Sequence, residues 1–468
     1  MDGKCRVLLH DVDTGDAVEL GPREWVLISG ADGTRDLEGI AIAAEREGVK
    51  TSRASVAQML ADLDRAGMLA EGPAPKSAAW RGPQREEGEA LAKVPRSERP
   101  VVHLPGYAFQ CDGHGSCCQL YATVVFSPLE AARARSVRPD VLDGGDRHEH
   151  VFTPERGSGP CAGSAVALVD GRCAYLEGSL CGLHRKAGPE SKPIGCNLFP
   201  LSLVDDGTRV RASVAVECAC VLESLGKPGG APILDPAVKT RGEIDPAIVV
   251  DELPPDVTVA GDVRAPIEAY LPWSDAALSA LDSSDDPALA AWALAAEIEA
   301  NGLDPERAKA VVRASPPLEG HLAAHWLAAL ADKAARRAKA QNTWRSPRDL
   351  CRRGVSIVAA SAGLLADPDV LAAVAAGAGA AHDEEAFYLR VALFGHQMVG
   401  YPLAVALRDR AVAIWVARTF PLAAEALYPG DEDPAFRHPI ALVEALLRGH
   451  GLRRYTDAVA DEREHARC

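Results

Sequence analysis

The first part of the chain alternates apolar and polar residues in short runs and then changes to helical spacing. Residues 7–10 and 17–20 alternate on either side of the turn signal Asp13-Thr14-Gly15-Asp16, which predicts a β-hairpin. Apolar residues then recur at intervals of three and four, as on one face of a helix. The clearest of these faces consists of Val56, Met59, Leu60 and Leu63. Strands followed by short helices predict a small winged-helix-like domain over residues 1–72.

Beyond this domain the pattern changes three times. Residues 73–104 are rich in proline, glycine and charge, and we expect a linker there. Short apolar runs and turn signals predict a compact α+β unit over residues 105–225 and an extended linker over residues 226–274. Residues 275–468 are rich in alanine and leucine, with Asp286-Pro287 as a typical helix start. The predicted fold class is therefore α+β and multidomain, with an α-helical C-terminal domain.

Composition and charge narrow the classes of partner. The 468 residues correspond to about three domains, and 47% apolar residues suffice to bury their cores. The chain has 66 Asp and Glu against 50 Lys and Arg, a net charge of −16. Residues 1–75 share the excess, with 14 acidic and 8 basic side chains. Because such a field repels phosphate groups, we expect no nucleic-acid partner, even for a winged-helix-like domain.

The sequence also lacks the apolar segments that lead a protein into a membrane. Acidic residues interrupt the N-terminus before any apolar run of signal length, and no uncharged apolar stretch approaches about 18 residues. We therefore expect a cytoplasmic protein with no membrane partner.

Cysteine is the residue type whose distribution departs most from a uniform one. Nine of the twelve cysteines fall within 110 consecutive residues. Because reductants in the cytosol oppose stable disulfides, such a cluster indicates metal binding before disulfide bridges. The nine are Cys111, Cys117, Cys118, Cys161, Cys173, Cys181, Cys196, Cys218 and Cys220.

The local sequence around these cysteines favours convergence on a metal. Gly113 and Gly115 permit a tight loop before the adjacent Cys117-Cys118, which would form only a strained disulfide with each other. A turn at Glu177-Gly178 is expected to bring Cys173 and Cys181 side by side across a short hairpin. Zinc and iron–sulfur clusters both accept four cysteine ligands, so the spacing alone does not choose between them.

Three motifs carry a resemblance to a known family. They are Phe109-x-Cys111 leading to Cys117-Cys118, Gly171-x-Cys173-x-Tyr175-Leu176 leading to Cys181-x-x-His184, and Gly195-Cys196-x-x-Phe199-Pro200. Over roughly residues 105–420 the chain resembles the CxxCxxCC-type zinc- or iron-chelating cysteine-cluster family. Within that family it is most similar to flagellin lysine-N-methylases, through residues 183–191 and 385–402.

The resemblance implies a ligand set and a cofactor. It favours an iron–sulfur cluster, of the four-iron type, over zinc, and it implies S-adenosylmethionine as a second cofactor. The cysteines at matching positions are Cys111, Cys117, Cys118, Cys173, Cys181, Cys196 and Cys218.

The chain departs from the family pattern in one place. A further cysteine usually precedes the adjacent pair, where this chain has residues 113–116. His114 would replace that ligand, or the site would have one ligand fewer. We interpret His184 as a structural hydrogen-bonding residue. The remaining cysteines are interpreted as ordinary thiols: Cys5, Cys161, Cys220, Cys351 and Cys468.

The N-terminal domain resembles a second family. The turn, the segment from Trp25 to Arg35 and the ending Leu63-Asp64-Arg65-Ala66-Gly67-Met68-Leu69 are similar to the small PqqD-like peptide-binding domains. This resemblance implies that a protein or peptide substrate docks along a strand edge. A purely structural cap is the alternative.

Two functions follow from these observations. The first is methyl transfer from S-adenosylmethionine to the ε-amine of a protein lysine. The chain has neither the glycine-rich turn of Rossmann methyltransferases nor the CxxxCxxC spacing of radical enzymes, and no catalytic base is predicted. The alternative is a non-enzymatic metal-binding or redox-responsive protein with a peptide-docking N-terminal domain.

Overall fold

The computed structural model divides the chain into two compact units, Met1–Lys76 and Ser77–Cys468. In the first, the structure describes residues 7–10, 17–20, 27, 37, 40, 41, 44, 49 and 51–65. In the second, it describes residues 94–113, 115–120, 124–126, 128–139, 151–154, 164–166, 168–169, 172–245, 248–282, 284–314, 318–342, 349–376, 382–449 and 452.

The first unit contains the predicted hairpin and helix. Strand β1 (Val7–His10) pairs antiparallel with β2 (Ala17–Leu20), so the pairing of the two alternating runs is confirmed. Helix α3 (Arg53–Arg65) begins after Ser52, whose Oγ accepts a hydrogen bond from the Ser55 amide at 3.2 Å. A small apolar core includes the fully buried Val56. The winged-helix interpretation of the whole unit stays a prediction.

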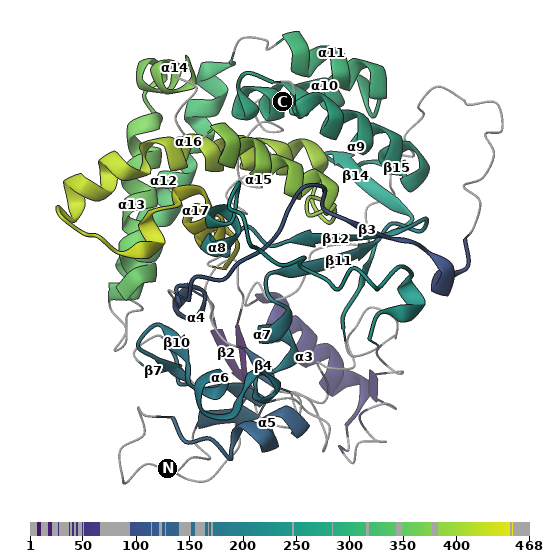
Figure 1. Cartoon of the computed structure of the whole chain (residues 1–468), viewed down its shortest axis with the longest axis vertical. Helices are drawn as coiled ribbons and strands as arrows, with labels where there is room; N and C mark the ends of the chain where they lie inside the picture. Colours follow the sequence, from purple (N-terminus) through teal and green to yellow (C-terminus); the bar gives the residue numbers. More distant parts are fainter. Residues whose placement is uncertain are drawn as a thin grey trace. The chain divides into compact units, whose positions relative to one another are not determined.

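A four-stranded sheet lies in the middle of the second unit (Figure 1). Its order is β13 (Asp251–Glu252), β11 (Leu201–Asp205), β12 (Val210–Val214) and β3 (Val101–His103). The two central strands form an antiparallel hairpin, and the two outer strands run parallel to their neighbours. All five residues of β12 are buried. Strand β13 comes from the segment that the sequence predicted as an extended linker.

The cysteine-rich region consists of short elements. Strands β4 (Val125–Phe126), β6 (Ser164–Val166) and β5 (Phe152–Pro154) form one sheet in that order. Two further hairpins are β7 (Leu168–Val169) with β8 (Arg172–Cys173) and β9 (Leu176–Glu177) with β10 (Leu180–Cys181). The helices are α4 (Cys117–Leu120), α5 (Pro128–Ala134), α6 (Gly182–Ala187), α7 (Ile194–Leu198) and α8 (Ala219–Glu223), with the 3-10 turn η3 (Pro189–Ser191). The 3-10 turns η1 (Arg96–Glu98) and η4 (Arg241–Glu243) lie before and after this region.

The C-terminal half is helical, as the sequence predicts. A hairpin of β14 (Asp256–Ala260) and β15 (Val263–Pro266) precedes it. The helices are α9 (Ile267–Leu281), α10 (Pro287–Asn301), α11 (Pro305–Ala314), α12 (Gly320–Asn342), α13 (Asp349–Leu365), α14 (Pro368–Ala376), α15 (His382–Phe394), α16 (Leu403–Leu427) and α17 (Pro439–Gly449), with the turn η5 (Pro434–Phe436) before α17. Asp286 caps α10, since its Oδ1 accepts from the Leu289 amide at 2.9 Å.

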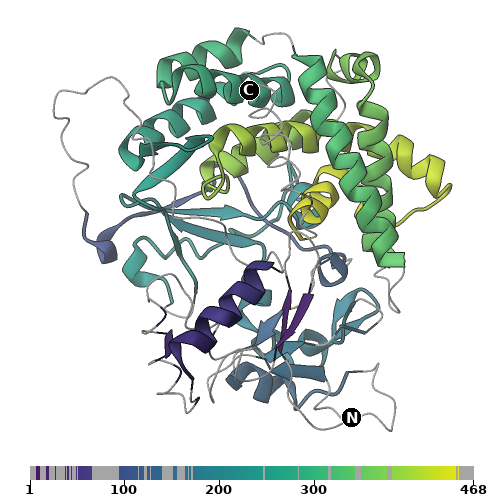
Figure 2. The same ribbon diagram turned by 180° about the vertical axis from the view of Figure 1, so that it is seen from behind.

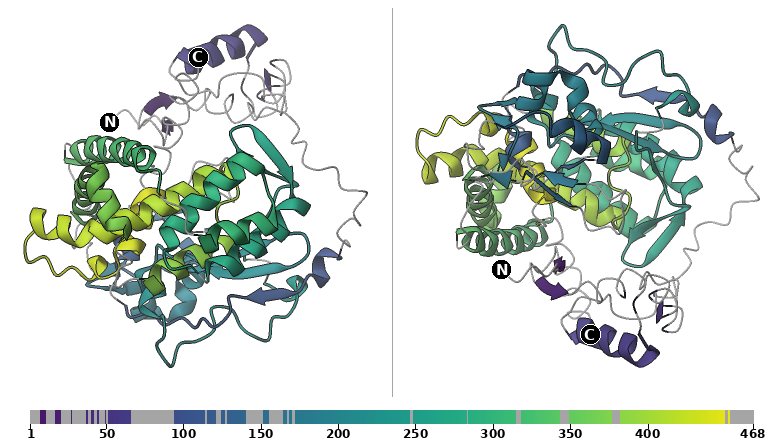
Figure 3. Two further views of the ribbon diagram at one scale, coloured as in Figure 1. Left: turned by 90° about the horizontal axis from the view of Figure 1, so that it is seen from above. Right: turned by 90° about the horizontal axis from the view of Figure 1, so that it is seen from below.

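Helix α16 is the central element of this half. It packs against α10 on one side and α13 on the other, and Figure 3 shows it from above between the α12–α13 pair and the α9–α11 helices. Ion pairs buried within its packing fix its neighbours. Arg410 pairs with Glu444 of α17 and donates to the Tyr388 hydroxyl at 2.8 Å, and Arg418 pairs with Glu385 of α15 at 2.8 Å.

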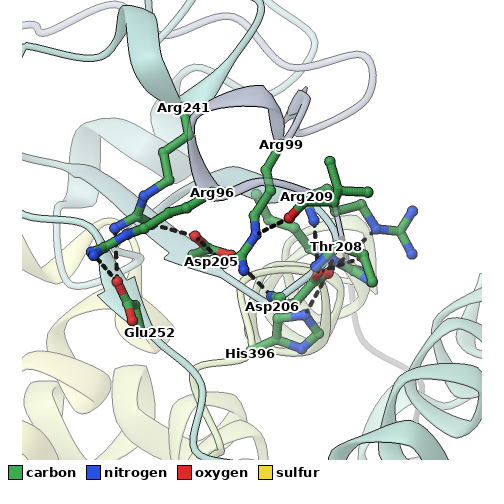
Figure 4. Close-up of polar contacts among 12 residues, drawn as sticks. Arg96, Arg99, Asp205, Asp206, Thr208, Arg209, Arg241, Glu252 and His396 are labelled. Atoms are coloured by element: carbon green, nitrogen blue, oxygen red, sulfur yellow. Dashed lines mark hydrogen bonds and ion pairs between the residues drawn. The ribbon is translucent and has the colours of Figure 1, made fainter. Parts of the chain in front are cut away.

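The sheet is joined to the elements around it by a second polar network (Figure 4). Asp205, at the end of β11, accepts hydrogen bonds from Arg99 at 2.8 and 2.9 Å and from Arg241 at 2.5 Å. The adjacent Asp206 lies 3.7 Å from Nε2 of His396, a buried residue with a positive φ of 50° in the corner before α16. These contacts connect the β11–β12 hairpin with the start of the unit and with the helices.

The same layers are visible from behind (Figure 2): long helices, the four-stranded sheet and the short elements of the cysteine-rich region. The short helices α4 and α8 of that region both contact α17, and α4 also contacts α13. Within the described residues, no single helix combines the length and hydropathy of a membrane span. Helices α13 and α14 do so only as a pair bent by 99°.

Candidate metal centre

Five of the seven cysteines predicted as ligands line one open cavity of about 380 Å³. They come from three parts of the sequence that the fold brings together. The rest of the described lining is mostly apolar, with Val124, Phe126 and Phe199 among its residues. The five cysteines are Cys117, Cys118, Cys173, Cys181 and Cys196.

A glycine determines how Cys117 and Cys118 reach the cavity. They begin helix α4, with their Sγ atoms 4.0 Å apart. The turn before them has Gly115 at φ +72°, where a Cβ would lie 2.5 Å from the carbonyl oxygen of Ser179. Only glycine lets the loop pass this close to the β9–β10 hairpin. The two glycines noted in the sequence therefore do allow a tight loop, with Gly113 at φ +76°.

The two hairpin cysteines are arranged differently from the prediction. The turn at Gly178 is present, but its strands are only two residues long, and Cys181 pairs with Leu176. Cys173 lies on the preceding hairpin, opposite Leu168. The expectation that Cys173 and Cys181 face each other across one hairpin is wrong, because the pairing around Gly178 ends at Leu176 and Cys173 belongs to the hairpin before it. Both side chains nevertheless line the same cavity.

The fifth cysteine, Cys196, lies on helix α7 near Lys192. The Ile194 amide donates to Glu130 Oε1 of α5 at 2.7 Å, which fixes the start of this helix. Among the described lining residues, Lys192 alone has a charged side chain. Burial raises the pKa of Cys196 to about 12, with the neighbouring Cys173 adding to the rise and Lys192 opposing it.

Burial and neighbouring thiols raise the pKa of three of the cavity cysteines, Cys117, Cys173 and Cys196. Burial raises the pKa of Cys173 to about 11. The hydrogen bond with Cys118 and then burial raise that of Cys117 well above its usual value. Several thiolates in one apolar cavity would therefore be costly without a cation, and a thiophilic metal removes that cost.

The other two predicted ligands, Cys111 and Cys218, are not among the residues that line the cavity. They lie instead with Cys220, which the sequence interpretation set aside as an ordinary thiol. The Cys220 thiol donates to Asp112 Oδ1 at 3.0 Å, and its Sγ lies 4.0 Å from Cys111 Sγ. Spacing gave one signal of this arrangement: Cys218-Ala219-Cys220 places two thiols at the start of a helix.

The remaining candidates fall into two classes. His184 is exposed on α6 and is not among the cavity-lining residues, and Cys351 is buried on α13 with its thiol 3.7 Å from the Gln119 carbonyl oxygen. His114, Cys5, Cys161 and Cys468 lie outside the described residues.

The donors do not converge on one point as the side chains stand. Across the described residues, no three histidine, cysteine, aspartate or glutamate side chains lie close enough together to hold a metal ion. A single zinc ion needs four donors, each about 2 Å from one centre. A four-iron cluster instead carries its irons at the corners of a cube, so it accepts thiols that are spread around a larger volume.

The chain matches no protein family model, no curated protein and no solved structure. The two family resemblances seen in its motifs therefore stay predictions.

Proposed function

We propose that the cysteine-lined cavity holds a thiolate-bound metal centre, an iron–sulfur cluster of the four-iron type in preference to zinc. One observation supports this above all: five cysteines from three distant segments line a single cavity. The protein would then act as a cytoplasmic metalloprotein with a redox or ligand-binding centre.

The residues present fit such a group. The donors are thiols, the rest of the described lining is mostly apolar, and Lys192 supplies a positive charge beside Cys196. When bound, an iron–sulfur cluster would supply one-electron redox chemistry or a Lewis-acidic iron. Cys117, Cys118, Cys173, Cys181 and Cys196 would provide four ligands with one thiol to spare, while the apolar side chains would limit access of water.

A second candidate is methyl transfer from S-adenosylmethionine to a protein lysine. The observation that favours it is the size of the cavity, because about 380 Å³ lies within the range of small-molecule sites. In this proposal the apolar wall would contact the cofactor and Lys192 would pair with its carboxylate. The non-enzymatic alternative, a metal-holding or redox-responsive protein, needs no such ligand.

We further propose that the N-terminal unit is a winged-helix-like, PqqD-like module that docks a protein or peptide. In the described part of this unit, β1 pairs only with β2, which leaves an outer edge on each strand for strand addition. An extended peptide that binds the full chain, and no longer binds once Leu8 and Val18 are replaced by proline, would support this role. Equal binding by both forms would favour a structural cap.

Anaerobic purification followed by iron, sulfide and zinc analysis tests the metal centre. We expect about four irons and four sulfides per chain and a broad visible absorption. The double replacement Cys117→Ser with Cys118→Ser should abolish metal retention, whereas Cys351→Ser, at a buried cysteine outside the cavity, should not. Metal content that is unchanged in the double variant would refute the ligand assignment.

Labelled S-adenosylmethionine and lysine-containing protein substrates distinguish the two candidate functions. Methyl transfer that needs the cavity cysteines would support the methylase. Stoichiometric zinc without iron, together with no transfer under reducing conditions, would favour the non-enzymatic protein.

A further inference from the structure

A pair of cysteines outside the cavity lies in contact through its sulfur atoms. Cys220 Sγ is 4.0 Å from Cys111 Sγ, and the two residues are 109 positions apart in sequence. Cys111 belongs to the loop before helix α4, and Cys220 belongs to helix α8. Both are free thiols in this structure. The fold thus brings two thiols from distant segments to a separation that a small movement would close.

Hydrogen bonds hold the two segments together beside this pair. The Tyr107 hydroxyl donates to the Val221 carbonyl at 3.1 Å, and the Gln110 amide donates to Ser224 Oγ at 3.0 Å. The same Ser224 hydroxyl donates to the Cys220 carbonyl at 2.6 Å. The loop is therefore fastened along helix α8, and the two sulfurs stay close without a bond between them.

The two thiols differ in their access to solvent. Cys111 is exposed, whereas Cys220 is only 5% exposed and donates from its thiol to Asp112 Oδ1 at 3.0 Å. A small molecule in solution can therefore reach the first sulfur more readily than the second. In a thiol–disulfide exchange, this difference makes Cys111 the thiol that reacts first and Cys220 the thiol that displaces the small molecule afterwards.

Closing a bond between the two sulfurs needs only a local movement. A disulfide has an S–S distance of about 2.05 Å, so the sulfurs must approach each other by roughly 2 Å. Rotation about the Cα–Cβ bond of Cys111 moves its sulfur while the backbone stays in place. The Sγ atoms of Cys117 and Cys118 are also 4.0 Å apart, but a disulfide between adjacent residues closes a strained ring. Of these two contacts, the one between Cys111 and Cys220 is suited to a disulfide.

We propose that Cys111 and Cys220 are a modification site, at which a low-molecular-weight disulfide such as oxidised glutathione produces a reversible disulfide bond between them. In the first step the Cys111 sulfur bonds to one sulfur of the small disulfide, whose S–S bond breaks, and the Cys111 proton ends on the departing thiol. In the second step the Cys220 sulfur bonds to that of Cys111, and a second small thiol departs with the Cys220 proton. Both cysteines are oxidised, and the small disulfide is reduced to two thiols.

The raised pKa of Cys111 makes this exchange slow. Its contact with the Cys220 thiol and then burial raise that pKa, so little thiolate is present at neutral pH. The reverse reaction is slow for the same reason, because a thiol of high pKa is a poor leaving group. The bond therefore forms under sustained oxidising conditions and persists after them.

The bond would act on the loop that leads to the cavity. It would fasten that loop covalently to helix α8 six residues before Cys117, the first cysteine that lines the cavity. Cysteine pairs of cytosolic proteins that do form disulfides are usually catalytic or redox-sensing. The modification needs no metal, so it goes beyond the proposed function and does not depend on it.

Anaerobic incubation of the full chain in glutathione buffers of graded ratio tests the proposal. The reaction is followed over hours, stopped with acid, and mapped by mass spectrometry after alkylation of the free thiols. We expect a linked peptide of Cys111 with Cys220 to accumulate as the buffer becomes more oxidising and to disappear on reduction. Cys220→Ser should hold one glutathione on Cys111, because the displacing thiol is absent. Cys351→Ser, at a buried thiol outside the pair, should form the bond as the wild type does.

Two results would overturn the proposal. One is a folded chain without the linked peptide in the most oxidising buffer, and the other is a chain in which Cys111 pairs with Cys117 or Cys118 instead. Metal analysis of the same samples separates the proposal from the proposed function. A chain that is purified without metal and still forms the bond would refute the metal centre and support this site, whereas full metal content without the bond would do the reverse.

Discussion

The carbonyl oxygen of Ser179 lies 2.5 Å from the place where a Cβ on Gly115 would be. This contact joins the loop before Cys117 to the hairpin that ends at Cys181. Because both parts are backbone, neither can move aside as a flexible side chain would. The cavity therefore depends on a residue that carries no chemistry of its own.

Replacing Gly115 by alanine should widen the cavity and weaken metal retention. The variant has both a left-handed φ and a backbone clash, so we expect a loss of about 2–3 kcal/mol in unfolding free energy, measured by urea denaturation. Gly106→Ala is the control, since Gly106 also has a positive φ, +67°, but nothing within 4 Å of its Cβ position. It should lose only about 1 kcal/mol and keep its metal. Equal losses would show that the Ser179 contact is unimportant.

The pH dependence of stability should contain a contribution from His438. Its Nδ1 lies 3.0 Å from Glu384 Oε1, and its Nε2 contacts Glu223 of helix α8. The hydrogen bond with Glu384 raises the pKa of His438, burial opposes the rise, and Glu223 adds to it. A raised folded-state pKa stabilises the protein fully below the unfolded value near 6.5, and this stabilisation is lost as pH rises through the folded value.

His438→Gln should therefore cost about 1–2 kcal/mol at about pH 5.5 and much less at about pH 9. Urea denaturation at the two pH values measures the difference. His321→Gln, on an exposed position of α12, should show no such dependence. A cost that is the same at both pH values would mean that the imidazole acts through packing alone.

Breaking the buried pair of Arg410 and Glu444 should be among the most damaging single changes in the helical half. Both side chains are 2% exposed, so Arg410→Met removes the cation beside the Glu444 carboxylate in the core and leaves it the hydrogen bond from the Tyr388 hydroxyl. We expect a loss of about 3–5 kcal/mol. Arg336→Ala removes the exposed pair with Asp332 and should change stability little. The double variant Arg410→Met with Glu444→Leu removes both charges. If it is no more stable than Arg410→Met alone, the uncompensated carboxylate is not the cause of the lost unfolding free energy.

Lys192 should set the reduction potential of the centre in the cavity. Its positive charge favours the form with one more electron, and the apolar surroundings strengthen the effect. Lys192→Gln should disfavour reduction about tenfold, which is roughly 59 mV for one electron. Lys192→Arg should stay near the wild type in the same redox titration. A potential that is unchanged in the glutamine variant, with full metal content, would exclude this role.

Local patterns predicted local structure well. The pairing of residues 7–10 with 17–20, the start of α3 and the cap at Asp286 each depend on neighbours in sequence, and each is present. The cysteine motifs predicted seven ligands in one centre, and five of the seven line one cavity.

The sequence patterns did not predict contacts between residues that are far apart in the chain. The position of Cys111 depends on backbone hydrogen bonds to residues more than 100 positions away, such as that of Gln110 with Ser224. Backbone donors leave no trace in the spacing of side chains, so the sequence did not separate Cys111 and Cys218 from the cavity group. The spacing of Cys218 and Cys220 was its one signal that Cys220 belongs with them. The partner of Cys173 was missed for a related reason, because two hairpins follow each other too closely for spacing to tell which strand is which.

Helix α17 contacts both α4, which begins with two cavity cysteines, and α8, which carries Cys220. Helix α17 thus contacts two cysteine-bearing helices that are more than 90 residues apart in sequence. Helix α17 also carries the buried Glu444, which pairs with Arg410 of helix α16. The placement of both cysteine-bearing helices, and of α16 behind them, is thus supported by the packing of one helix near the end of the described residues.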